Sequence, residues 1–231
     1  MRWFNSAAAC LTAEWRLKAA LSLGLGVMFC VPYFTLQYLT LWPVRTFALT
    51  PVDEAIVFDP AWVWAYQSVY LLVGLVPWVS TSRAQLARYA KGFALLSSMG
   101  FLCFLVFPVA GPRPEAVPTT GMFGWLVWYD QPRNAFPSLH VGLASYSLMY
   151  GARISQGVLP RSARRLLLSA GIVWAGAIAY AALATKQHYA IDFPPGVLLA
   201  WVAHRWSWRD MTLASTGRSM VSGRTVAGSG Q

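Results

Sequence analysis

Long segments without charged residues restrict what this chain can fold into more than any other feature of its sequence. Five segments contain no Asp, Glu, Lys or Arg: residues 19–44, 60–82, 92–112, 134–152 and 166–185. Their lengths are close to the roughly 20 residues that carry an α-helix across the hydrocarbon core of a bilayer. A sixth segment, residues 193–203, reaches that length only if its polar flanks lie in the interfacial zones. The chain is therefore predicted to cross a membrane six times.

The composition points the same way. Hydrophobic residues make up 57% of the 231 residues and charged residues only 11%, which does not describe the surface of a soluble domain. We expect an all-α integral membrane protein in which residues 1–209 form a six-transmembrane-helix bundle. Residues 210–231 are rich in Ser, Gly, Thr and Arg and have no apolar face to bury, so they are predicted to be a disordered cytoplasmic tail.

The placement of the basic residues decides between two explanations of the net charge of +10, a nucleic-acid partner and membrane topology. If the loops alternate between sides, 14 of the 18 Lys and Arg residues fall on one side of the membrane and 4 on the other. The positive-inside rule puts the richer side, with both termini, in the cytoplasm. We therefore expect a multi-pass protein of the cell (inner) membrane, whose partner is the bilayer and not a nucleic acid.

The longest outer connection contains an aromatic segment, Met122-Phe-Gly-Trp-Leu-Val-Trp-Tyr129. Trp and Tyr rings suit the boundary between membrane and water, where one part of the ring is wet. A short interfacial helix is expected here, lying on the bilayer and shaping an entrance for a lipid head group. A simple aromatic anchor is the alternative.

Three residues at the predicted outer face carry most of the functional signal: His140, His188 and Asp192. Because Asp192 follows His188 by four positions, its carboxylate can accept a hydrogen bond from one imidazole nitrogen and leave the other free as a nucleophile. Taken singly, each residue can also be an interfacial anchor. Their convergence on one face favours a catalytic site, which we expect to be extracytoplasmic.

Residues around His140 favour a phosphate as the ligand of this site. Pro137 is expected in the first turn of the fourth span, which would place the amide of Ser138 and its neighbours at a helix amino terminus, a natural phosphate cradle. His140 is then placed to act as a general acid. Arg113, on the same side, offers a planar, permanently charged fork for phosphoryl oxygens.

Together these motifs resemble the type-2 phosphatidic acid phosphatase superfamily of membrane lipid phosphatases and phosphotransferases. The similarity rests on Arg113-Pro114, Pro137-Ser138-Leu139-His140 and His188-Tyr-Ala-Ile-Asp192, in that order. It implies that His188 is the nucleophile, Asp192 its orienting partner and His140 the general acid. It also implies that Arg113 and Ser138 bind phosphate, and that neither a cofactor nor a metal is needed.

The chain departs from the family pattern at two expected phosphate ligands. A lysine usual seven residues before the arginine is replaced by Val106, and a Ser-Arg pair usual before the third motif is replaced by Ala181 and Ala182. Lys186 and Arg133 are the nearest substitutes. The altered set is similar to the branch that contains the inositol phosphorylceramide synthases, which transfer head groups between lipids.

The predicted function is therefore hydrolysis of a phosphomonoester or pyrophosphate lipid at the outer leaflet through a phosphohistidine. Transfer of the phosphorylated head group to a second lipid is the alternative within the same chemistry. A transporter is less favoured, because the centres of the spans hold no ionisable residue. A zinc site built from His140, His188 and Asp192 is conceivable by ligand type, but the basic residues nearby would repel a cation.

Overall fold

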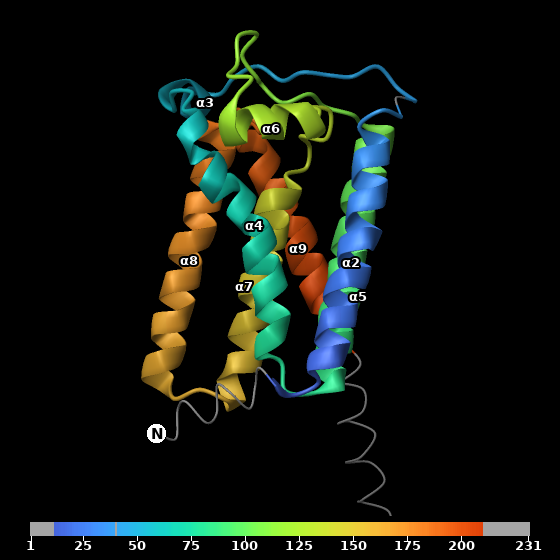
Figure 1. The fold of residues 1–231 in the computed structure, drawn as a ribbon, viewed down its shortest axis with the longest axis vertical. Helices are drawn as coiled ribbons and strands as arrows, with labels where there is room; N and C mark the ends of the chain where they lie inside the picture. The colour runs from blue at the N-terminus through green and yellow to red at the C-terminus, as the bar shows by residue number, and fades with distance from the viewer. Residues whose placement is uncertain (1–11, 40, 210–231) are drawn as a thin grey trace, which may run out of the picture.

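The computed structural model describes residues 12–39 and 41–209, and the predicted tail, residues 210–231, lies outside these ranges. In the part described, every regular element is a helix. The long helices are α2 (Trp15–Leu36), α4 (Val63–Leu75, flanked by the 3-10 turns Pro60–Trp62 and Val76–Val79), α5 (Arg83–Val106), α7 (Leu139–Ile154), α8 (Arg161–Ala184) and α9 (Phe193–Ser207). They stand side by side as an upright bundle (Figure 1). The all-α prediction is confirmed for the described residues.

Four segments are long and apolar enough to cross a bilayer: Trp15–Leu36, Pro60–Val79, Arg83–Val106 and Arg161–Ala184. The helices α7 and α9 have only 16 and 15 residues, which at 1.5 Å per residue gives about 24 Å or less. The six predicted charge-free segments thus correspond to six long helices, of which four have the length and hydropathy of membrane spans. That α7 and α9 also cross the membrane stays a prediction.

Helix boundaries differ from the charge-free segments for a physical reason. The first segment was predicted to continue to residue 44, yet α2 ends at Leu36, and α5 begins at Arg83, well before residue 92. A segment without charged residues has low polarity, but its backbone need not be helical. The charge-free segments therefore include apolar loops as well as helices. Conversely, charged residues at a helix end are tolerated because their side chains reach out of the apolar layer.

The centre of the bundle is α7, which packs against α9, α8, α4 and α5. Its crossing with α9 is close because two glycines meet there. A Cβ on Gly196 would lie 2.4 Å from the backbone oxygen of Ser138, and a Cβ on Gly142 would lie 3.1 Å from the oxygen of Gly196. Only hydrogen fits at Gly196 without a shift of backbone, so this glycine sets the distance between the starts of α7 and α9.

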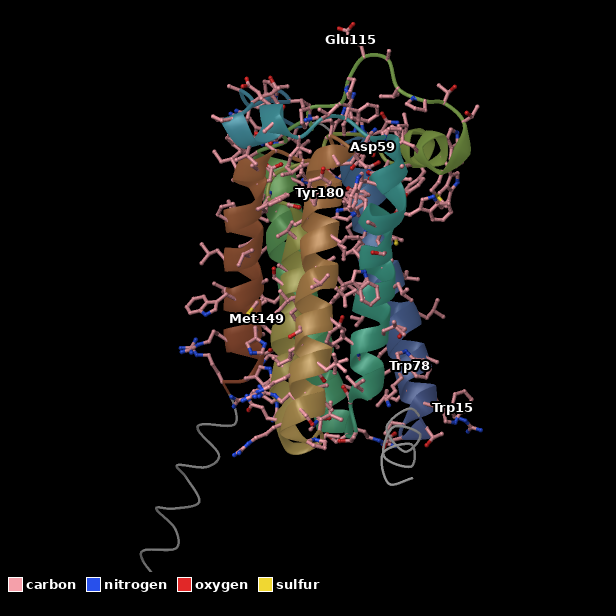
Figure 2. The ribbon with its side chains drawn as sticks, turned by 90° about the vertical axis from the view of Figure 1, so that its left-hand side faces the viewer. Trp15, Asp59, Trp78, Glu115, Met149 and Tyr180 are labelled. Carbon is pink, nitrogen blue, oxygen red and sulfur yellow. The ribbon has the colours of Figure 1, made fainter. Side chains whose placement is uncertain are left out.

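The connections 41–59, 107–138 and 185–192 gather at one end of the bundle, which we call the loop end (Figure 1). Asp59 and Glu115 lie there, whereas Trp15 and Trp78 lie toward the other end (Figure 2). Two short helices, α3 (Pro51–Ala55) and α6 (Gly121–Tyr129), cover the loop end. The helix expected near residues 122–129 is therefore present, and its place on a bilayer stays a prediction.

Three extended segments join at Val109 and tie the loop end together. Val109 forms bridges with Arg45 on one side and Asn134 on the other. The amide of Ala135 donates to the oxygen of Val109 at 3.0 Å, and the amide of Ala110 donates to the oxygen of Arg45 at 2.8 Å. These bonds hold residue 135, a backbone partner of the candidate site, against the end of α5.

Candidate active site

His188 lies at the loop end, in the turn between α8 and α9, with only 4% of its surface exposed. Its Nδ1 atom is 2.8 Å from the backbone oxygen of Ala135. A carbonyl oxygen can only accept, so Nδ1 carries a proton, and in the neutral imidazole the lone pair is on Nε2. This is the tautomer that a nucleophilic histidine requires. The Ala135 oxygen was not foreseen, because a backbone acceptor leaves no signal in the side-chain sequence.

Asp192 is fully buried, and its Oδ2 atom lies 3.4 Å from Nδ1 of His188. The same oxygen accepts a hydrogen bond from the amide of Tyr189 at 2.8 Å. The two residues occupy the turn before α9, which opens at Phe193 with prolines in its first turn. The predicted neighbourhood of His188 and Asp192 is thus present, although the backbone oxygen of Ala135 is the closer acceptor, at 2.8 Å against 3.4 Å.

His140 faces His188 from the first turn of α7. The two ring centroids are 5.6 Å apart, and the His140 ring stacks on Tyr66 of α4, with a centroid distance of 3.9 Å. Its Nε2 atom is buried and has no hydrogen-bond partner within the described residues. Sequence reasoning missed Tyr66, because nothing in the apolar pattern of α4 separates this ring from ordinary core residues.

Arg113 is held at the loop end by Gln187, the residue that precedes His188. Its Nε atom donates to Oε1 of Gln187 at 3.0 Å, and a second guanidinium nitrogen donates to the same oxygen. Gln187 in turn donates from Nε2 to the oxygen of Thr185 at 3.0 Å. Gly111 lets the two loops meet, since a Cβ there would lie 2.4 Å from the backbone oxygen of Gln187. In the sequence, the available signal for Gln187 was a polar residue directly before the predicted nucleophile.

Ser138 is the N-cap of α7, and its Oγ atom accepts from the amide of Val141 at 3.4 Å. Pro137 therefore precedes the helix and does not lie in its first turn, as the sequence had suggested. The amide of Ser138 donates to the backbone oxygen of Asp192 at 3.1 Å. This bond joins the motif around His140 directly to the motif around His188.

The two expected substitute ligands have other partners in this structure. Lys186 donates from Nζ to the backbone oxygens of Asp53 at 2.7 Å and Ile56 at 2.5 Å. Arg133 donates to the oxygen of Gln37 at 3.4 Å and lines a shallow pocket with residues 41–44. Phosphate binding by Lys186 and Arg133 stays a prediction, and these contacts give each a structural role.

A buried acid that the sequence did not single out, Asp130, lies at the end of α6. It accepts hydrogen bonds from the hydroxyl of Tyr33 at 3.1 Å and from Nε2 of Gln37 at 2.6 Å. Burial raises the pKa of Asp130 to about 6, against the lowering effect of the Arg113 charge and these hydrogen bonds. The network ties the end of α2 to the loop that carries Ala135.

The described residues form an all-helical protein with four segments long and apolar enough to cross a bilayer, and they bring two buried histidines, an Asp and an Arg together at the loop end. Comparison with known families makes this specific. The model of the PAP2 superfamily matches residues 38–206, more than half of the chain, and the chain belongs to that superfamily. Its members are phosphatases or phosphotransferases. Comparison with curated proteins and with solved structures gave no match.

Proposed function

We propose that this protein is a lipid-phosphate phosphatase that works at the outer leaflet through a phosphohistidine on His188. The observation that carries the proposal is the hydrogen bond from Nδ1 of His188 to the Ala135 oxygen, which leaves the lone pair of the neutral imidazole on Nε2, with the His140 ring 5.6 Å away. A nucleophile and an acid–base partner thus stand on opposite elements, as transfer in two steps requires.

The first step forms a bond between Nε2 of His188 and phosphorus and breaks the bond from phosphorus to the leaving oxygen. Protonated His140 gives its proton to that oxygen. Arg113 and the hydroxyl of Ser138 bind the phosphoryl oxygens, whose charge spreads as the bond breaks. The carboxylate of Asp192, 3.4 Å from Nδ1, stabilises the positive charge that develops on the His188 ring.

The second step discharges the phosphohistidine to water. His140, now neutral, takes a proton from the attacking water molecule while oxygen bonds to phosphorus. The bond to Nε2 breaks, and its electron pair returns to His188. The products are inorganic phosphate and the protonated His140 with which the cycle began, so the same two histidines serve both steps.

A lipid substrate is supported by an apolar cleft below the site. The cleft has a volume of about 190 Å³ and is lined by Gly26, Phe29 and Cys30 of α2, Tyr70 and Gly74 of α4, and Phe93 of α5, among others. Tyr70 is also in ring contact with His140, at a centroid distance of 6.1 Å. A lipid whose head group lies at His188 would therefore extend its apolar chain along α2 and α4. The whole of α2 lies outside the residues that the family model matches.

The test is phosphate release from phosphatidic acid and from an isoprenoid pyrophosphate by protein purified in detergent. We expect His140→Ala to lower kcat by roughly 100-fold or more and His188→Ala by still more. His204, near the far end of α9, is the matched control and should tolerate alanine. Substrate labelled in the phosphate should leave acid-labile, base-stable label on the wild-type protein but not on His188→Ala. Label that persists in His188→Ala would refute the proposal.

Transfer to a second lipid is favoured by one specific observation, the loss of two usual phosphate ligands. Ala181 and Ala182 are fully buried and pack in an apolar cluster with Val63 and Tyr66, so no cation replaces the missing pair there. A site with fewer positively charged groups suits a substrate whose phosphate remains a diester. In mixed micelles with an excess of an alcohol-bearing lipid, free phosphate as the main product supports hydrolysis. Label recovered in the second lipid would show a head-group transferase.

A further inference from the structure

The short helix α3 lies over the segment that carries His188 and is built around one acid, Asp53. Both the amide and the hydroxyl of Thr50 donate to Oδ2 of Asp53, at 2.8 and 2.7 Å, and the amide of Asp53 donates to Oγ1 of Thr50 at 3.3 Å. This is a capping box, an ordinary way to begin a helix. The capping box uses only Oδ2 of the Asp53 carboxylate as an acceptor. The other oxygen, Oδ1, is directed at a different element.

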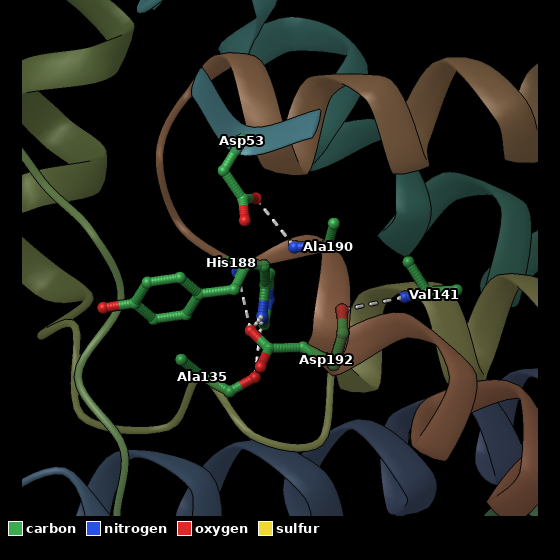
Figure 3. Close-up of polar contacts among 8 residues, drawn as sticks. Asp53, Ala135, Val141, His188, Ala190 and Asp192 are labelled. Atoms are coloured by element: carbon green, nitrogen blue, oxygen red, sulfur yellow. Dashed lines mark hydrogen bonds and ion pairs between the residues drawn. The ribbon is translucent and has the colours of Figure 1, made fainter. Parts of the chain in front are cut away.

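The second oxygen, Oδ1 of Asp53, accepts a hydrogen bond from the amide of Ala190 at 2.8 Å (Figure 3). The preceding amide, that of Tyr189, donates to Oδ2 of Asp192 at 2.8 Å. Two carboxylates therefore hold two consecutive amides immediately after His188. The backbone of this turn cannot rotate without breaking one of these charge-assisted bonds.

The other side of His188 is held by the same loop. Nζ of Lys186 donates to the backbone oxygens of Asp53 and Ile56, at 2.7 and 2.5 Å. Lys186 has a φ of 53°, a left-handed conformation that is unfavourable for a residue with a side chain. The amide of Asp59 also donates to the oxygen of Ala184 at 2.9 Å. The loop 50–59 thus binds the chain both before and after His188.

Burial makes the contact with Ala190 more than a surface cap. Only 2% of Asp53 is exposed, and a carboxylate removed from water is tolerated when hydrogen bonds compensate it. Its neighbour Glu54 is exposed on the same helix. A cap that served α3 alone would need neither this burial nor a partner 137 positions away along the chain.

We propose that Asp53 is a positioning residue for phosphoryl transfer: by holding the amide of Ala190, it fixes the turn 186–192 so that Nε2 of His188 meets phosphorus in line. The inference rests on the proposed function. Asp53 does not touch the reacting atoms, and it acts through the backbone that carries His188 and Asp192. Its loss should slow the formation of the phosphohistidine while substrate binding at Arg113 and Ser138 persists.

The experiment compares Asp53→Ala, Asp53→Asn and Glu54→Ala, each purified in detergent and assayed on phosphatidic acid. We expect Asp53→Ala to lower kcat by about tenfold or more with KM changed less than about threefold, because a misplaced catalytic group costs rate more than binding. Asparagine still offers an oxygen to Ala190, so Asp53→Asn should recover part of the rate. Glu54→Ala should match the wild type. Wild-type kcat in folded Asp53→Ala would overturn the proposal.

If Asp53→Ala does not fold, a second pair of variants, Thr50→Val and Asp53→Asn, tests the proposal. Thr50→Val removes the hydroxyl bonds of the capping box but leaves the bond from Ala190 to Asp53. We expect single-turnover formation of phosphohistidine to slow in Asp53→Asn and to stay within about twofold of the wild type in Thr50→Val. Equal slowing in both would show that α3 acts only as a structural cap. Full activity of His188→Ala would instead refute the proposed function, so the two failures are distinguishable.

Discussion

At the scale of single residues, the proposed site contains neighbours that present hydrogen-bonding atoms to the proposed catalytic groups. His188 is oriented by a backbone oxygen, and Arg113 by the side-chain oxygen of Gln187. Such partners set the direction of a functional group without touching substrate. Their removal should therefore affect one kinetic constant more than the other, depending on which group they direct.

Gln187→Ala should raise KM by about tenfold, because Arg113 loses a charge-assisted hydrogen bond worth roughly 1.5 kcal/mol and no longer stays directed at the phosphate. The effect on kcat should be smaller than that of His140→Ala. Steady-state kinetics on a lipid phosphate measures both constants. Gln156, exposed in the turn after α7, is the matched control, and its alanine variant should behave as the wild type. An unchanged KM in Gln187→Ala would show that Arg113 needs no such partner.

At the scale of elements, two features place the site: the close crossing of α7 with α9, and the attachment of α2 to the loop that follows α6. The crossing brings the amide of Ser138 to the oxygen of Asp192 at 3.1 Å. The attachment uses Tyr33, Gln37 and Asp130. The first feature leads to a prediction about packing, and the second to a prediction about how stability depends on pH.

Gly196→Ala should destabilise the protein by about 1–3 kcal/mol, because the new Cβ would meet the backbone oxygen of Ser138 at 2.4 Å and backbone cannot yield cheaply. Activity should fall with it, since the starts of α7 and α9 move apart. Gly176→Ala on α8 is the control, because no atom lies within 4 Å of a Cβ there. That variant should be neutral or more stable by up to about 1 kcal/mol. Thermal unfolding in detergent distinguishes the two, and equal stability would contradict the close crossing.

Asp130 should make stability depend on pH with a defined sign. Its pKa is about 6 in the folded protein, raised by burial from the ordinary value of 3.8, so the folded state holds the proton more tightly. The associated stabilisation is complete below about pH 4 and is lost as pH rises through about 6, by up to roughly 3 kcal/mol. Asp130→Asn should remove this component. The measurement is the difference in unfolding between variant and wild type at pH 4 and pH 7, and a difference independent of pH would contradict it.

At the scale of the whole molecule, the loops 41–59, 107–138 and 185–192 meet at one end (Figure 1), which is the arrangement that the alternating topology predicts. The side of the membrane on which that end lies is part of the proposal, as is the lipid nature of the substrate. Both can be tested on the intact protein.

Orientation is tested with single cysteines at exposed positions of opposite ends, Thr119→Cys and Arg161→Cys, after replacement of the native cysteines. Position 119 lies in a connection of the loop end and position 161 begins α8. A membrane-impermeant thiol reagent should label position 119 in intact cells and position 161 only after lysis. The reverse pattern would place the site on the cytoplasmic side.

The apolar cleft is tested with two glycines of one helix. Gly26 lines the cleft and Gly24 does not, and a Cβ on either would meet no atom within 4 Å. Gly26→Leu should raise KM for phosphatidic acid with long chains severalfold, because the leucine occupies space meant for an acyl chain. It should leave hydrolysis of p-nitrophenyl phosphate unchanged. Gly24→Leu should affect neither substrate, and equal effects of the two variants would remove this support for a lipid substrate.

The sequence by itself determined that the chain is helical and apolar, and which residues were candidates for chemistry. Charge-free length reports burial in lipid, and the spacing of His188 and Asp192 reports local geometry. Both properties depend on residues close together along the chain. Boundaries were less predictable, because Pro137 and the apolar loops obey local backbone preferences that low polarity does not reveal.

Only the tertiary structure decided how these residues are held. The Ala135 oxygen beside His188, the Tyr66 ring on His140, Gln187 on Arg113 and Asp53 on Ala190 all join different segments of the chain. Several of these contacts use backbone atoms, which every residue possesses and no side-chain pattern marks. The physical reason is that the tautomer and direction of a catalytic group depend on the atoms packed around it, and packing brings together segments that the sequence keeps far apart.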